Sequence, residues 1–173
     1  MLIRREAPAD LYAIRAVHAS AFADPLRPNS IPPEVGLVDA LRISDAWLPE
    51  LSLVAEGTDG TVVGHVVCSR GWVDGVPALG LGPLGVHADQ QLQGVGTALI
   101  HAVLGAADAV DEPFVALVGD PGFYRRFGFR PAAEYGISPA VADWEPEFQI
   151  RVLSAYDAAA RGTFAYATPF SEL

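Results

Sequence analysis

Lysine is absent from the 173-residue sequence, and all 11 basic residues are arginines. The sequence also contains 21 aspartates and glutamates, so its net charge at pH 7 is −10. It has no extended block of basic residues. Such a surface repels a phosphate backbone, so we expect no nucleic-acid partner. The same charge favours a cationic molecule or a basic peptide end, although salt screens this attraction beyond about 8 Å.

Cysteine occurs once, so neither an internal disulfide nor a paired-thiol metal site can form. Cys68 could be read as a nucleophile, but it lies between Val67 and Ser69 in an apolar run. A free cysteine in such a run behaves as a small buried hydrophobe. We therefore assign Cys68 to the core, expect no metal site, and expect a cytoplasmic protein.

Long hydrophobic runs are also missing. None approaches the roughly 18 residues of a membrane-spanning helix. The N-terminal segment alternates polar and apolar residues instead of forming the apolar centre of a signal peptide. We expect no membrane partner. Hydrophobic residues nevertheless make up 51% of the chain, enough for one sizeable core, and residues 1–173 are predicted to form a single domain.

Apolar periodicity predicts a mixed order of strands and helices. In the first half we expect a strand at 2–4, a helix from residue 11 capped by Asp10, a helix at 34–42, and a hairpin of 51–56 and 61–69. In the second half we expect strands at 78–86, 114–118, 149–153 and 163–167, a helix at 97–109, and a helical turn at 123–127. Residues 155–160 are compatible with a helix, and 132–147 carry no sharp signal. This order predicts an α+β (mixed α/β) fold with one central mixed sheet flanked by helices.

The most informative segment, residues 78–104, runs from a strand through a glycine-bearing turn into a helix. Gly94 and Gly96 lack Cβ atoms, so their backbone can approach a ligand closely. The first amides of the following helix have no partner within that helix, and the helix dipole adds positive potential there. A pyrophosphate fits such a turn, even in an acidic protein. A tight turn without a ligand would need the same glycines, so that alternative stays open.

Other phosphate-binding and hydrolytic motifs do not fit. The spacing Gln91-x-x-Gly94-x-Gly96 differs from the Gly-x-Gly-x-x-Gly of dinucleotide folds and follows antiparallel hairpins. Without lysine there is no Gly-Lys-Ser or Gly-Lys-Thr phosphate loop. A serine hydrolase would need a Gly-x-Ser-x-Gly elbow, which is also missing.

Gly82 and Pro83 lie inside the strand that precedes the turn. Proline cannot donate to a strand ladder, so we expect a bulge that separates this strand from its neighbour. The backbone of Leu84, Gly85 and Val86 would then be free to pair with an extended amide-bearing ligand such as pantetheine. The alternative is a bulge that serves only sheet curvature.

The turn resembles the acetyl-CoA-binding motif Gln/Arg-x-x-Gly-x-Gly/Ala of the GNAT superfamily of acyltransferases, through Gln91, Gly94 and Gly96. Gln91 replaces the commoner arginine, and Ala88 stands where a proline often follows the strand. Neither difference removes an amide donor.

A second segment, residues 118–129, resembles the Tyr-x-x-x-Gly-Phe ending of the same family through Tyr124, Gly128 and Phe129. The run Gly-Asp-Pro-x-Phe-Tyr-x-Arg-Phe-Gly-Phe and the closing GTFAYATPF are similar to one bacterial subgroup of largely uncharacterised acyltransferases.

The resemblance implies a GNAT-like splayed sheet and direct transfer of an acetyl (acyl) group from acetyl-CoA to an amine of a small molecule or peptide, in a ternary complex, by a monomer or homodimer. It implies cofactor contacts from the splayed strand, the turn and the later segment: Leu84, Gly85, Val86, Gln91, Leu92, Gln93, Gly94, Val95, Gly96, Thr97, Asp120, Phe123, Tyr124 and Phe127. The alternative is a noncatalytic acyl-CoA-binding sensor or interaction module, which would need the glycines but not Tyr124.

The reaction itself makes demands on side chains. An amine with a pKa of about 10.4 is only about one part in 2,500 neutral at pH 7, so some group must accept its proton. The resemblance implies that the Tyr124 hydroxyl protonates the leaving sulfur and that the Val86 N–H meets the carbonyl oxygen. No base is evident. His87, beyond the splayed strand, and Glu34, on the second helix, are candidates, but the alternative of a solvated surface residue stays open for His87 and is favoured for Glu34.

Two adjacent arginines and three further histidines have not yet been assigned a role. One of Arg125 and Arg126 could meet CoA phosphates, or both could be solvated. His18, His65 and His101 show no metal-ligand spacing, and we interpret them as structural.

Overall fold

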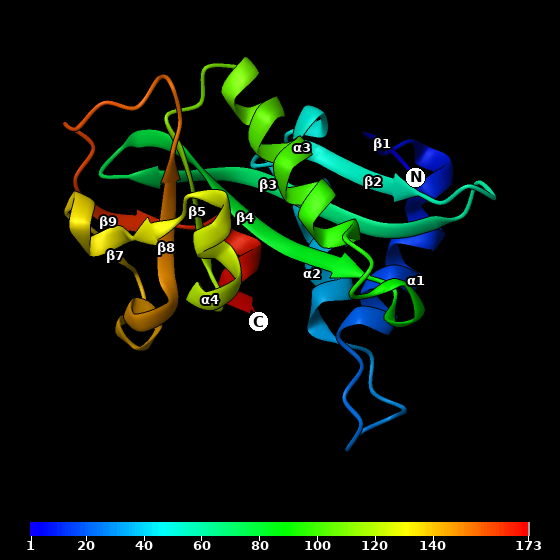
Figure 1. The fold of residues 1–173 in the computed structure, drawn as a ribbon. Coiled ribbons are helices and arrows are strands. Elements are labelled where there is room, and N and C mark those ends of the chain that lie inside the picture. Colours follow the sequence, from blue (N-terminus) through cyan, green and yellow to red (C-terminus); the bar gives the residue numbers. More distant parts are fainter. Residues whose placement is uncertain (173) are drawn as a thin grey trace.

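The computed structural model describes residues 1–172 and contains one mixed sheet of nine strands (Figure 1). The strands are β1 (Leu2–Arg5), β2 (Ser52–Glu56), β3 (Val62–Val73), β4 (Val76–Val86), β5 (Phe114–Val118), β6 (Arg130–Pro131), β7 (Ile137–Pro139), β8 (Phe148–Val152) and β9 (Gly162–Ala165). Their order is β1-β2-β3-β4-β5-β8-β6, and β9 pairs with both β3 and β7. Only the β4–β5 and β7–β9 pairs are parallel. The predicted mixed class is confirmed.

Helices cover both faces of this sheet: α1 (Leu11–Ala21), α2 (Pro33–Arg42), α3 (Val95–Ala109) and the short α4 (Pro121–Tyr124). A Cβ atom on Gly64 would meet Leu99 and Val95 of α3, whereas one on Gly85 would meet His18 and Ala21 of α1. Residue 64 lies opposite residue 86, and residues 85 and 86 point to opposite faces. Therefore α3 and α1 lie on opposite sides of the sheet (Figure 1). No helix within residues 1–172 is long and apolar enough to cross a membrane.

The core has two main parts, joined through the sheet. Under α3, residues such as Leu99, Ile100 and Val103 pack on Cys68 and its neighbours. A second cluster surrounds Phe114, with Phe148 and Phe164 among its members. Cys68 is fully buried, and burial raises its thiol pKa above the ordinary range. Its assignment to the core is confirmed.

Most predicted elements are present, with two corrections. Residues 155–160 form turns instead of a helix: Tyr156 N donates to Leu153 O, and the Asp157 carboxylate accepts from Ala159 N at 2.9 Å. Asp10 stands at the start of α1, but its side chain makes no cap bond there. Its carboxylate accepts from Arg4, at 2.7 and 3.0 Å, and from Ala7 N, at 2.7 Å, at the start of the preceding short 3-10 turn. These contacts stand in place of a cap on α1.

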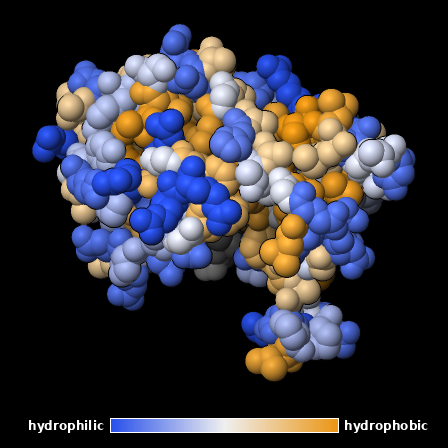
Figure 2. Space-filling model, viewed as in Figure 1, coloured by the Kyte–Doolittle hydropathy of each residue, from blue (hydrophilic) through white to orange (hydrophobic). Residues whose placement is uncertain are grey.

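The connection between α1 and α2 projects from the body of the molecule (Figures 1 and 2). It leaves hydrophobic side chains such as Leu26 and Ile31 in solvent. At one end of this connection stands Phe22, and beyond its other end α2 carries Glu34 in its first turn. Both residues border the site described below.

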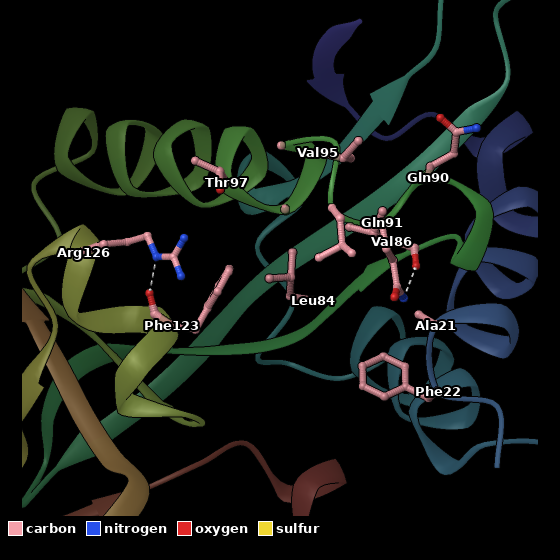
Figure 3. A pocket seen from close by; sticks show the side chains of 13 residues that line it. Ala21, Phe22, Leu84, Val86, Gln90, Gln91, Val95, Thr97, Phe123 and Arg126 are labelled. Carbon is pink, nitrogen blue, oxygen red and sulfur yellow. Dashed lines mark hydrogen bonds between the residues drawn. The ribbon is translucent and has the colours of Figure 1, made fainter. Parts of the chain in front are cut away.

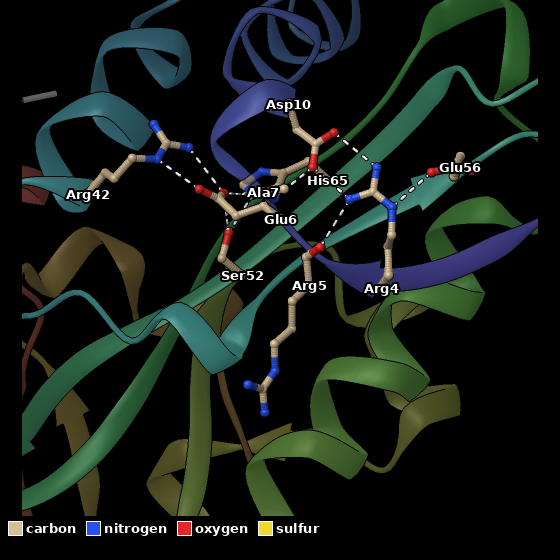
Figure 4. Close-up of polar contacts among 9 residues, drawn as sticks. All are labelled: Arg4, Arg5, Glu6, Ala7, Asp10, Arg42, Ser52, Glu56 and His65. Carbon is tan, nitrogen blue, oxygen red and sulfur yellow. Dashed lines mark hydrogen bonds and ion pairs between the residues drawn. The ribbon is translucent and has the colours of Figure 1, made fainter.

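A buried polar network ties the N-terminal elements together (Figure 4). Arg42 donates two hydrogen bonds to the Glu6 carboxylate, at 2.9 and 3.1 Å. Ser52 donates to Glu6 at 2.5 Å, its oxygen lies 2.9 Å from His65 Nε2, and His65 Nδ1 lies 2.8 Å from His18 Nε2.

The Glu6 carboxylate can only accept hydrogen bonds, and this fixes which atoms of the network are donors. Because the only Ser52 hydroxyl proton goes to Glu6, His65 Nε2 must carry a proton for Ser52. His65 Nδ1 therefore accepts from His18 Nε2, which leaves His18 Nδ1 as a bare acceptor. That atom is buried and has no hydrogen-bond partner among the described residues. His18 and His65 are structural, as predicted, and burial lowers the pKa of both, so they are uncharged at neutral pH.

Candidate active site

The free edge of β4 is the centre of the site. Among the described residues, β4 pairs with β5 only at Leu79 and Gly80. On its other side β4 pairs with β3, but the register shifts between Val66, opposite Leu84, and Cys68, opposite Leu81. The shift inserts Gly82 and Pro83 as a bulge, which confirms the predicted interruption. Beyond the bulge, β4 and β5 separate.

Backbone groups of β4 point into this gap. His87 N donates to Val63 O at 2.9 Å, so Val86 and Gly64 face each other as a pair that shares no hydrogen bonds. The N–H and C=O of Val86 therefore point away from β3, towards the gap. Leu84 lies two residues earlier and has the same orientation. Two amides of β4 are thus available to a ligand that enters between the strands.

The turn that begins α3 closes one end of the gap (Figure 3). Gly94 caps α3 with a φ of 86°, a left-handed conformation that favours glycine. The Gln91 side chain donates to Val86 O at 3.1 Å and so joins the turn to the free edge of β4. The α3 N-terminus thus directs its unpaired first amides and the positive end of its dipole at the gap.

A cavity of about 460 Å³ lies in front of this turn. Its wall consists of Ala21, Phe22, Leu84, Val86, Gln90, Gln91, Leu92, Gly94, Val95, Gly96, Thr97, Phe123 and Arg126. Arg126 is the single charged side chain of this wall; it donates to Phe123 O at 2.9 Å and stacks 4.6 Å from the Phe123 ring centre. Helix-terminal amides beside a fixed arginine suit a pyrophosphate with further phosphate groups.

The two adjacent arginines lie in different places. Arg125 lines a separate groove with Pro121, Gly122 and Phe129. Of the pair considered from the sequence, Arg126 alone reaches the cavity in front of the turn.

A second cavity, of about 370 Å³, lies beyond the bulge and shares Phe22 and Leu84 with the first. Its wall consists of Phe22, Glu34, Leu37, Leu81, Gly82, Pro83, Leu84, Leu117, Val118, Tyr124, Trp144, Tyr166 and Phe170. Tyr124 stands over Gly119, where a Cβ atom would come 2.5 Å from the tyrosine ring. Burial raises the pKa of Tyr124 to about 12, so its hydroxyl stays protonated at neutral pH.

The structure brings most predicted site residues to these two cavities. Tyr124 and Glu34 line the second, and the predicted residues in the wall of the first are Leu84, Val86, Gln91, Leu92, Gly94, Val95, Gly96, Thr97 and Phe123. His87 instead borders a groove with Asp10, Val17 and Thr61, outside both cavities. Between the two candidate bases, only Glu34 shares a cavity with Tyr124.

Four further predicted cofactor contacts lie outside both walls and have local contacts of their own. Gly85 faces His18, and the Gln93 side chain donates to Asp89 O at 3.1 Å. Asp120 caps α4 by accepting from Gly122 N at 2.8 Å. Phe127 is buried, with its ring centre 5.2 Å from that of His101.

Four residues that line the second cavity were not predicted from the sequence. Phe22, Trp144, Tyr166 and Phe170 come from three segments that are distant in sequence. Trp144 belongs to the stretch without a clear pattern, and Tyr166 and Phe170 lie in the closing segment, whose similarity to a bacterial subgroup was the one available signal. Within residues 1–172, no cluster of three or more His, Cys, Asp or Glu side chains is arranged to hold a metal.

Comparison with known proteins agrees with this geometry. A model of the acetyltransferase (GNAT) domain matches residues 49–131. The chain is 33% identical to the uncharacterized N-acetyltransferase YhbS of Escherichia coli K12 over 156 residues, which are 89% of this chain and 88% of that protein.

Two solved structures are also similar to this chain, one of E. coli YhbS itself and one of a further relative. The crystal structure of E. coli YhbS in complex with CoA superimposes with a TM-score of 0.87 at 31% identity, and covers 98% of this chain and 91% of that one. A GNAT family acetyltransferase from Brucella melitensis in complex with acetyl-CoA gives a TM-score of 0.77 at 34% identity, over 98% of this chain and 97% of that one. The chain belongs to the GNAT family of acetyltransferases.

Proposed function

We propose that this protein, acting as a single domain in the cytoplasm, transfers an acetyl group from acetyl-CoA to an amine of a small molecule within a ternary complex. One observation carries the proposal: two cavities meet at Leu84, beside amides of β4 that no strand of the described chain pairs. One cavity has the chemistry of a pyrophosphate site, and the other holds a tyrosine and a carboxylate.

The first cavity is the proposed acetyl-CoA site. The amides of the turn and of the first residues of α3 would hold the pyrophosphate, Arg126 would meet a phosphate group, and Leu84 and Val86 would pair with pantetheine amides. The CoA and acetyl-CoA complexes of the E. coli and B. melitensis relatives support this assignment.

Acetyl-CoA supplies a thioester, whose C–S bond breaks as the C–N bond to the amine forms. The Val86 N–H is the proposed donor to the thioester oxygen, where negative charge develops. Tyr124 would give its proton to the departing sulfur and regain one that originates from the amine. Its raised pKa keeps that proton in place until the sulfur becomes basic.

Glu34 is the proposed acceptor for the proton of the incoming ammonium group, through a water molecule. Its place in the same cavity as Tyr124 supports this role over His87. A carboxylate there also attracts the ammonium form, in which most of the amine arrives at neutral pH.

The experiment has a binding arm and a turnover arm. Acetyl-CoA should raise the melting temperature, and free thiol should appear when amines are added. Gly94→Val should lower stability and abolish the shift caused by acetyl-CoA. Gly75→Val is the matched control, because Gly75 has a φ of 84°, open surroundings like those of Gly94, and no place in either cavity.

The two arms separate the possible outcomes. Gly75→Val should lose similar stability but keep the shift. Normal binding by Gly94→Val would refute the phosphate-turn assignment. Binding without thiol release from any amine would instead indicate the noncatalytic CoA-binding module.

A further inference from the structure

The second cavity has an unusual chemical composition for a site that accepts an amine. Among its wall residues, Glu34 is the single acidic or basic side chain, and Tyr124 and Tyr166 supply hydroxyl groups. All other side chains are apolar, aromatic or absent. A wall of this kind offers few side-chain partners for several hydroxyl groups and no second charged side chain for a further cation or an anion, so burial of such groups here costs hydration that is only partly replaced.

Aromatic rings form one side of this cavity. Tyr166 lies on Gly80, where a Cβ atom would come 2.7 Å from two atoms of its ring. Its ring centre is 4.7 Å from that of Phe170, 4.8 Å from that of Phe164, and 6.1 Å from that of Trp144. Such tilted and edge-on packing holds each ring in place. We call Trp144, Tyr166 and Phe170 the aromatic wall.

Glu34 stands at the start of α2, a different element from those that carry the aromatic wall. No arginine or histidine of the described residues forms an ion pair with it. Glu34 thus lines a cavity whose other side chains carry no charge, and a single ammonium group complements it.

Size sets a further limit. A volume of about 370 Å³ is that of about a dozen water molecules, so the cavity suits a compact molecule, not a long chain. Both cavities meet at Leu84, so an amine beside Glu34 and Tyr124 would approach the acetyl group while the rest of the molecule fills the apolar space.

We propose that the acceptor is a small monoamine with an aromatic or bulky apolar body, which packs on Trp144, Tyr166 and Phe170 while its ammonium group faces Glu34. This inference rests on the proposed acetyltransferase function and names the substrate class for that same site. It excludes polyamines, amino sugars and peptide ends with polar side chains as preferred acceptors.

The test compares four amines with the complete protein and acetyl-CoA: phenethylamine, ethanolamine, the dication agmatine, and a short peptide with an N-terminal serine. Because a peptide α-amine has a pKa of about 7.7–8.0, well below that of an alkylamine, each kcat/KM is expressed per neutral amine. Free thiol is measured over a range of amine concentrations. We expect kcat/KM for phenethylamine to exceed that for the other three by about tenfold to a hundredfold. A substrate that lacks an apolar group for which the pocket is shaped typically has its kcat/KM lowered by such a factor. Trp144→Leu should lower kcat/KM for phenethylamine about tenfold and lower that for ethanolamine by a clearly smaller factor.

Tyr135→Leu is the matched control, because Tyr135 is a half-buried aromatic residue that lines neither cavity. It should leave all four values unchanged. A turnover-free measurement complements these rates: phenethylamine should bind to the complex with CoA, and Glu34→Gln should weaken that binding about tenfold.

The outcomes are distinguishable. Preferred acetylation of ethanolamine, agmatine or the peptide would overturn this inference and leave the acetyltransferase function standing. Equal effects of Trp144→Leu on phenethylamine and ethanolamine would also overturn it. Absence of turnover with every amine, while acetyl-CoA still binds, would overturn the proposed function and this inference together.

Discussion

The unpaired Nδ1 atom of His18 lies 2.8 Å from the position that a Cβ atom on Gly85 would occupy. The other ring nitrogen of His18 is held by His65, so the ring cannot move away without breaking the buried network. Gly85 lies between Leu84 and Val86, whose amides face the proposed acetyl-CoA site. The network therefore supports the back of the strand that carries the site.

This contact predicts that Gly85→Ala destabilises the protein by about 1–3 kcal/mol, the usual cost of one extra carbon in a packed interior. Denaturant unfolding measures it. Gly96→Ala is the control, because its Cβ atom would lie 3.7 Å from Val86 Cγ2, an ordinary contact. Equal stability of Gly85→Ala and wild type would show that the His18 ring is free to shift.

The same network predicts how stability depends on pH. Burial is the main cause that lowers the pKa of His18 to about 3, and electrostatic effects of His65 and Arg42 act in the same direction. In the unfolded chain this residue titrates near 6.5, so between about pH 6.5 and 3 the unfolded state binds a proton that the folded state does not. Stability should therefore fall as the pH drops below 6.5, by about 1.4 kcal/mol per pH unit from His18 alone.

Urea midpoints between pH 8 and pH 5 test this dependence. His18→Asn should be less stable at pH 8 and should show a shallower slope below pH 6.5. His101→Gln, at an exposed position on α3, should keep the wild-type slope. Parallel pH curves for wild type and His18→Asn would contradict the assignment of a buried, neutral His18.

Glu6 makes the stability of the fold depend on pH in a lower range than His18 does. Burial raises its pKa, but hydrogen bonds from His65, Arg42 and Ser52 and the charge of Arg42 outweigh that effect, and the net pKa is about 2. A carboxyl group with a lowered pKa stabilises the folded state above its unfolded value of 4.5, and this contribution is lost as the pH falls from there towards 2. A second acid step below pH 4.5, smaller in Glu6→Gln, should follow the histidine step.

Arg126 and Arg125 give a matched pair for cofactor binding. Arg126 lines the proposed acetyl-CoA site, whereas Arg125 lines another groove. Arg126→Ala should weaken acetyl-CoA binding about tenfold at low salt and reduce its salt dependence, because a charge-assisted contact is lost. Calorimetric titration at two salt concentrations measures both effects. Equal weakening by Arg125→Ala would indicate a general effect of surface charge.

Elements with strong local signals were predictable from the sequence. The strand at Phe114–Val118 has the predicted bounds, and the bulge at Gly82 and Pro83 follows from the lack of a proline N–H. Local reasoning failed where distant partners decide. The Asp10 carboxylate accepts from Arg4 and Ala7 N instead of capping α1, and the His18–His65 contact joins residues that no spacing rule connects.

The candidate site likewise has one part that could be predicted from the sequence and one part that could not. Its proposed phosphate-binding end depends on a continuous strand, turn and helix, so the motif around Gly94 could indicate it. The proposed acceptor end is assembled from Phe22, Trp144, Tyr166 and Phe170, which only the folded chain brings together. The choice between Glu34 and His87 likewise needed the three-dimensional arrangement, because both have plausible chemistry as isolated residues.

The last prediction concerns Tyr124, whose replacement by phenylalanine removes only a hydroxyl group. Tyr124→Phe should leave acetyl-CoA affinity nearly unchanged and lower kcat by about 10²- to 10⁴-fold, the usual contribution of a general acid. Because burial raises the pKa of Tyr124 to about 12, the hydroxyl should stay protonated, and this group should cause no fall in kcat between pH 7 and about pH 10.

A second acetyl donor separates an acid role for Tyr124 from a packing role. With a donor whose leaving group needs no proton, Tyr124→Phe should approach the wild-type rate, since the missing step is no longer required. Tyr156→Phe, outside both cavities, should match wild type with either donor. If Tyr124→Phe is slow with both donors, the hydroxyl positions the substrate instead of protonating sulfur. If it is fast with both, Tyr124 is a packing residue over Gly119, and another group must supply the proton.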